Sequence, residues 1–185
     1  IYLPHFSEIA RPLDDFSKVN PGILEARRQD GVNIHKTIKL YLDETLDYDL
    51  DEGNQIALDL FRDWQRTEGN IFGKLVEWEK PVYHETLMYA TTPDLVYEGG
   101  IVDIKTRNYM PHKDTVQLIA QVKCFPEIPT KSGWILYLDI IRRRPVFQRA
   151  EHPQAWVIFR QLLDKWYRDD SVEKMIRKWK GVVKL

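Results

Sequence analysis

The sequence predicts an α/β domain in which a mixed β-sheet is flanked by α-helices. Apolar residues recur at helical spacing early in the chain, β-branched and aromatic runs alternate with turn residues through the middle, and a long amphipathic helical pattern closes it. With 185 residues, of which 43% are hydrophobic, the chain suits one domain (residues 1–185) with a substantial core. It contains no internal repeat, low-complexity tract or Pro/Gly/Ser linker that would divide it.

Two helices are predicted in the first third. The first twenty residues contain Pro4 and Pro12 and are followed by Pro21, so they are expected to be irregular. Residues 21–47 indicate mainly helix, because His35 and Ile38 belong to an apolar stripe with spacings of three and four. Residues 54–69 repeat this spacing and end at a glycine, which favours a helix stop.

The later elements follow from β-propensity and one more helical pattern. We expect strands over 73–90 in one or two pieces, a hairpin over 91–106, a helix over 112–125, strands over 133–141 and 144–150, and a helix over 153–181.

The predicted hairpin, "TTPDLVYEGGIVDIKT" (91–106), gathers charge on one face. Side chains alternate along a strand, so Asp103 and Lys105 project to the same side. A two-residue turn at Glu98-Gly99 places Asp94 opposite Asp103, and a turn one residue later places it opposite Lys105. A three-residue turn would send Asp94 to the other face. A glycine is expected in the turn because it accepts a positive φ.

Two carboxylates on neighbouring strands repel each other unless a cation lies between them. Mg²⁺ prefers oxygen ligands, binds one or two carboxylates and leaves positions for water and phosphate. A lysine beside such a metal can stabilise charge that develops on a phosphate. The cluster therefore predicts a phosphodiester hydrolysis site, although the same spacing also occurs on ordinary protein surfaces.

Composition excludes several classes of site. The single cysteine, Cys124, rules out an internal disulfide, a cysteine zinc cage and a four-cysteine iron–sulfur cluster within this chain. No apolar run or signal-peptide pattern indicates a membrane association, so we expect an intracellular, cytoplasmic protein.

Residues 142–185 contain 12 Lys/Arg against 5 Asp/Glu. This charge indicates either a surface for the DNA backbone, with Arg142–Arg144 as candidate phosphate contacts, or a solvated helix face.

Four motifs occur in a defined order. "GVNIH" ends at His35, "TPD" ends at Asp94, "IVDIKT" contains Asp103 and Lys105, and the following helix carries Gln117. In this order they resemble the PD-(D/E)XK nuclease superfamily, and within it the RecB-like, phage-exonuclease-type branch. The resemblance spans roughly a hundred residues and implies a restriction-endonuclease-like core.

The resemblance also implies a ligand set. Asp94 and Asp103 would ligate Mg²⁺, for which Mn²⁺ would substitute, and the main-chain carbonyl of Ile104 and the side chain of His35 would complete the shell. Glu79 precedes the hairpin and aligns only loosely with an acidic position of some members, so it receives no role. The cysteines of cluster-binding members are absent, so no iron–sulfur cluster is expected.

For function, the resemblance implies a metal-dependent deoxyribonuclease, and we expect an exonuclease that processes DNA ends in recombination, repair or phage replication. Lys105 would be the catalytic lysine, and Gln117 would position the site or contact DNA. Gln121 stands where the family usually has tyrosine, which leaves that residue's role open. DNA is the expected partner, in a bacterial or phage-infected cell, and a homo-oligomer or a recombination or replication protein is a further candidate. The alternatives are a catalytically silent DNA-binding or assembly module on a nuclease fold, and an unrelated metal-free α/β domain.

Overall fold

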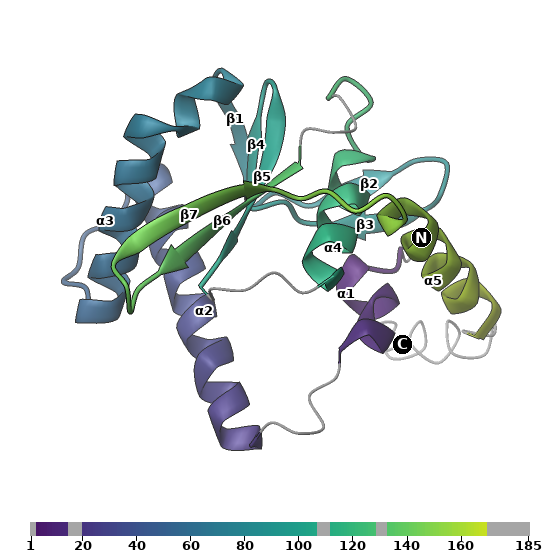
Figure 1. The fold of residues 1–185 in the computed structure, drawn as a ribbon, viewed down its shortest axis with the longest axis horizontal. Helices are drawn as coiled ribbons and strands as arrows, with labels where there is room; N and C mark the ends of the chain where they lie inside the picture. The colour runs from purple at the N-terminus through teal and green to yellow at the C-terminus, as the bar shows by residue number, and fades with distance from the viewer. Residues whose placement is uncertain (1–2, 15–19, 107–111, 129–132, 170–185) are drawn as a thin grey trace, which may run out of the picture.

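The computed structural model describes residues 3–14, 20–106, 112–128 and 133–169 (Figure 1). Its elements are α1 (Phe6–Ile9), α2 (Pro21–Leu42), α3 (Glu52–Thr67), β1 (Leu75–Trp78), β2 (Val82–His84), β3 (Tyr89–Thr91), β4 (Leu95–Tyr97), β5 (Gly100–Lys105), α4 (His112–Val122), β6 (Gly133–Asp139), β7 (Arg144–Arg149) and α5 (Ala155–Asp169). Short 3₁₀ turns span Arg11–Leu13 and Gly69–Phe72. The expected α/β class with a mixed sheet between helices is confirmed.

Within the described residues, the main sheet has five strands in the order β1-β4-β5-β6-β7, of which only β5 and β6 are parallel neighbours. Helix α4 lies between β5 and β6 in the sequence as their crossover connection, and the other neighbours are antiparallel. A separate two-stranded sheet pairs β2 with β3. Because β5 and β6 are parallel, their carboxyl ends meet at one edge of the sheet, where Asp103 and Lys105 lie.

The hairpin register matches one of the two predicted arrangements. Tyr97 pairs with Gly100, so the turn consists of Glu98 and Gly99, and continuing this register brings Asp94 beside Asp103. The reason given for glycine in the turn was wrong, because Gly99 does not have a left-handed φ. Close packing favours glycine here instead: an added Cβ would lie 3.1 Å from the carbonyl oxygen of Phe72, a tight contact.

Helices cover both faces of the main sheet (Figure 1). On one face α2 and α3 bury a core that includes Ile38, Trp64 and Ile104. On the other face α4 packs Leu118 against β5 and β6, in a cluster that includes Ile101. His35 therefore approaches β5 from one layer of helices, and Gln117 approaches it from the other.

A further core joins α1 to α5. Helices α1, α4 and α5 pack around β3, with Phe6, Tyr89 and Phe159 among the buried residues. The expectation of an irregular N-terminus was wrong for Phe6–Ile9, because tertiary packing and a capping box formed by His5 and Glu8 stabilise this short helix.

Other boundaries also differ from expectation. The strands expected over 73–90 form three pieces, and Thr91 belongs to β3 of the small sheet, because Pro93 separates it from β4. Helix α5 is described to Asp169, and the rest of the predicted 153–181 helix lies outside the described residues. Within the described part of the chain, no helix combines the length and apolar character that crossing a bilayer requires.

Candidate active site

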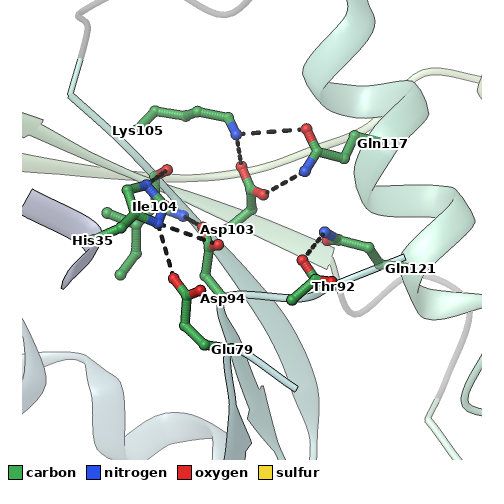
Figure 2. A network of polar contacts seen from close by, with 9 residues as sticks. All are labelled: His35, Glu79, Thr92, Asp94, Asp103, Ile104, Lys105, Gln117 and Gln121. Carbon is green, nitrogen blue, oxygen red and sulfur yellow. Dashed lines mark hydrogen bonds and ion pairs between the residues drawn. The ribbon is translucent and has the colours of Figure 1, made fainter. Parts of the chain in front are cut away.

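Two polar clusters meet at the carboxyl end of β5 (Figure 2). The first cluster consists of His35 from α2, Glu79 just after β1, and Asp94 just before β4. The second cluster consists of Asp103 and Lys105 from β5 and Gln117 from α4, whose side chains contact one another. Ile104 lies between Asp103 and Lys105 in the chain, and its main-chain groups reach the first cluster.

The first cluster has the geometry of a metal-binding group. One ligand atom each from His35, Glu79 and Asp94 lies within 4.8 Å of the others. Nδ1 of His35 is 3.2 Å from Oε1 of Glu79 and 3.4 Å from Oδ1 of Asp94. Nε2 of His35 is 3.2 Å from the carbonyl oxygen of Ile104. These residues also line one pocket.

Asp94 is fixed by the main chain of the neighbouring strand. Its Oδ2 accepts a hydrogen bond from the N–H of Ile104 at 2.6 Å, which leaves Oδ1 directed at His35. The predicted group of His35, Asp94 and the Ile104 carbonyl is thus brought together by three different elements.

Glu79 enters this group although the sequence assigned it no role. It has a left-handed backbone, with φ of 50°, which is uncommon outside glycine, and its N–H donates to the carbonyl of Asp94 at 3.1 Å. This turn at the end of β1 directs the Glu79 carboxylate to His35. The sequence signal that could have pointed to Glu79 is the position of this acidic residue directly after β1, the strand that pairs with β4.

The second cluster forms a closed set of contacts. Nζ of Lys105 is 2.6 Å from Oδ2 of Asp103. The amide of Gln117 donates to Oδ1 of Asp103 at 3.1 Å and accepts from Nζ of Lys105 at 3.5 Å. Asp103, expected to share a metal with Asp94, therefore turns toward Lys105 and Gln117 in this structure, and it is not among the three residues of the metal-binding group.

Burial sets the protonation of the second cluster. Asp103 is fully buried, and burial, with a smaller contribution from the Asp94 charge, raises its pKa to about 6 despite the nearby Lys105 ammonium. The pKa of Lys105 is also raised: burial lowers it, but Asp103, Asp94 and Asp114 together outweigh that effect. Asp114, buried on α4, is a further carboxylate that sequence reasoning did not single out. Lys105 is thus held as a cation.

In the first cluster, the surroundings favour the charged forms of both His35 and Asp94. Burial alone would lower the pKa of His35, but the charge and hydrogen bond of Asp94 and the hydrogen bond of Glu79 raise it to about 10. Burial alone would raise the pKa of Asp94, but His35, Lys105 and the Ile104 N–H together lower it. The imidazolium is therefore the cation that neutralises these carboxylates in the protein without metal.

This donor set suits a divalent cation. Two carboxylates, one main-chain carbonyl and one imidazole offer the oxygen-rich shell that Mg²⁺ and Mn²⁺ accept. The raised pKa of His35 indicates that the site already attracts positive charge. A metal that used His35 would have to displace its proton.

Arg142 and Arg143 lie in the β6–β7 turn, and Arg144 begins β7. Arg142 contacts the buried carboxylate of Asp139, and Arg143 contacts Glu52. All three arginines are exposed. The lysines predicted to extend this basic surface beyond Asp169 lie outside the described residues.

No protein-family model and no curated protein matches the chain. Among solved structures, it is similar to an alkaline exonuclease, LHK-Exo, from Laribacter hongkongensis, with 14% identity, a TM-score of 0.46, and coverage of 97% of this chain and 94% of that one. A second structure of LHK-Exo, in complex with dAMP, gives 16% identity, a TM-score of 0.45, and coverage of 98% and 95%.

Proposed function

We propose that the chain is a metal-dependent deoxyribonuclease that hydrolyses phosphodiester bonds, and that it acts as an exonuclease. The observation that carries the proposal is the junction of two clusters on β5: a histidine–carboxylate group suited to a divalent cation, and a buried lysine held as a cation beside it. The exonucleolytic mode comes from the family resemblance of the motifs.

In this proposal His35, Glu79, Asp94 and the carbonyl of Ile104 would hold Mg²⁺ or Mn²⁺, whereas Asp103 is turned toward Lys105 and Gln117. When bound, the cation supplies Lewis-acid polarisation of a phosphoryl oxygen and lowers the pKa of a water. The proposal differs from the ligand set expected from the resemblance in two residues: it includes Glu79, whose Oε1 lies 3.2 Å from Nδ1 of His35, and it leaves Asp103 with Lys105.

Lys105 would stabilise the negative charge that develops on the phosphate oxygens. Its ammonium lies 2.6 Å from Asp103, and the amide of Gln117 holds both side chains. Because the lysine side chain is only 18% exposed, its charge acts in a poorly screened environment, where it is worth more than in water.

The test is a cleavage assay with Mg²⁺ or Mn²⁺ on linear duplex, circular duplex and single-stranded DNA. We expect metal-dependent loss of linear DNA, abolition by EDTA, and resistance of the intact circle if the mode is exonucleolytic. Asp94→Asn should lose the activity, whereas Asp139→Asn, a buried carboxylate on β6 that contacts Arg142, is the matched control and should retain it. DNA binding without cleavage would instead support the silent module. If the protein neither binds nor cleaves DNA, the nuclease and the silent module are both excluded.

A further inference from the structure

Gln121 lies one helical turn after Gln117 on α4, so both amides point to the same side of the helix (Figure 2). Gln117 contacts Asp103 and Lys105, as described above. Gln121 reaches a different strand connection: its Nε2 donates to the carbonyl oxygen of Thr92 at 3.3 Å. Helix α4 therefore contacts both segments that carry the candidate site aspartates.

The contact with Thr92 fixes the orientation of the Gln121 amide. Rotating the amide by 180° would set Oε1 against the Thr92 carbonyl, with two acceptors facing each other. In the orientation present, Oε1 is buried and accepts no hydrogen bond from a described residue, and the whole side chain is 0% exposed. An apolar residue of similar length would avoid this unsatisfied oxygen but would leave the Thr92 carbonyl without its donor, so the contact with Thr92 explains the glutamine better than the packing of α4 does.

Thr92 lies in the connection between the small sheet and the main sheet. The segment Thr92-Pro93-Asp94 leaves β3 of the small sheet and enters β4 of the main sheet, and Pro93 has no N–H with which to pair. The hydroxyl of Thr92 lies 3.4 Å from Nε2 of His5, and its carbonyl accepts from Gln121. The main chain is thus held two residues before Asp94 enters the metal-binding group.

We propose that Gln121 is a positioning residue of the metal centre. It ties the connection between the two sheets to α4, so that the carboxylate of Asp94 stays directed at His35 while the Ile104 N–H holds its other oxygen. This inference rests on the proposed function, because it assigns Gln121 a part in the same metal site. Gln121 contacts none of the proposed ligands itself.

The experiment compares metal affinity with fold stability in the complete chain. Gln121→Met keeps the side-chain length and removes the donor. We expect its Mn²⁺ affinity, measured by calorimetry, to fall about 10-fold, as is usual when the partner that orients a ligand is lost. We expect the Tm of the metal-free protein to change little, because removal of the unsatisfied oxygen opposes the loss of the hydrogen bond to Thr92. Gln121→Asn keeps the amide but is too short to reach Thr92, and should also bind Mn²⁺ more weakly.

The control is Leu118→Ala on the same helix, which leaves a cavity against Gly133 and lowers Tm without touching Thr92. Its folded protein should bind Mn²⁺ like wild type. Wild-type affinity in both Gln121 variants overturns the inference, as does a loss of affinity in Leu118→Ala that matches theirs. If wild type binds no Mn²⁺, or if Asp94→Asn binds it equally well, the proposed function itself fails, which is a separate result.

Discussion

Replacing Asp103 by asparagine should stabilise the metal-free protein at neutral and alkaline pH. Burial raises the pKa of Asp103 from 3.8 to about 6, so the folded state binds its proton more tightly than the unfolded state does. Between these two values stability falls as pH rises, and at about 1.36 kcal/mol per pKa unit the loss amounts to about 3 kcal/mol. Asparagine mimics the protonated carboxyl and avoids this loss.

The assay is denaturant unfolding in EDTA at pH 5 and pH 8. Asp103→Asn should exceed wild type by about 3 kcal/mol at pH 8, and by about half of that or less at pH 5, where most of the wild-type carboxyl is still protonated in the folded state. Adding Mn²⁺ at 100 times its Kd should stabilise wild type by about 2.7 kcal/mol.

Two variants serve as controls for the sign of the change in the free energy of unfolding. The pKa of Asp94 is lowered, so its ionised form stabilises the fold, and Asp94→Asn should destabilise the metal-free protein at pH 8. Asp139→Asn loses its ion pair with Arg142 and should show no gain either. If Asp103→Asn destabilises the protein at pH 8 in EDTA, or gains equally at both pH values, the carboxylate is a structural partner of Lys105 and the reasoning is refuted.

Further predictions concern chemistry, protons and DNA. Lys105→Ala should retain Mn²⁺ and DNA binding within a few-fold but slow single-turnover cleavage by about 10²- to 10⁴-fold, and near-normal cleavage would remove Lys105 from the mechanism. Because the pKa of His35 is about 10 without metal, Mn²⁺ binding at pH 8 should release about one proton from it, detectable by calorimetry in buffers of different ionisation enthalpy; no release would exclude His35 as a ligand. Glu79→Gln should weaken Mn²⁺ binding and leave Tm nearly unchanged. If this variant binds Mn²⁺ as well as wild type does, Glu79 is not a metal ligand. Replacing Arg142–Arg144 by alanine should flatten the dependence of log affinity for DNA on log salt by about one to three units, and an unchanged slope would make this turn a solvated surface.

Most of the fold's framework could be predicted from local pattern. The alternation of Val102, Asp103, Ile104 and Lys105 assigns side chains to faces in any strand, because the period of two is a property of the extended backbone. The short turn before β5 limited Asp94 to two positions opposite that strand, and the structure contains one of them. Helix α4 was predicted because its apolar stripe has the period of a helix.

What sequence alone determined is therefore which residues share a strand face or a helix side: Asp103 with Lys105, and Gln117 with Gln121. Only the tertiary structure decided which of these groups meet. Glu79 joins His35 across 44 positions of sequence because a left-handed turn and the β1–β4 pairing direct it there, and neither feature has a local signature. The short helix α1 likewise forms because α5 and β3 bury it. Contacts of this kind depend on how separate elements pack, and the periodicity of a single segment does not encode that.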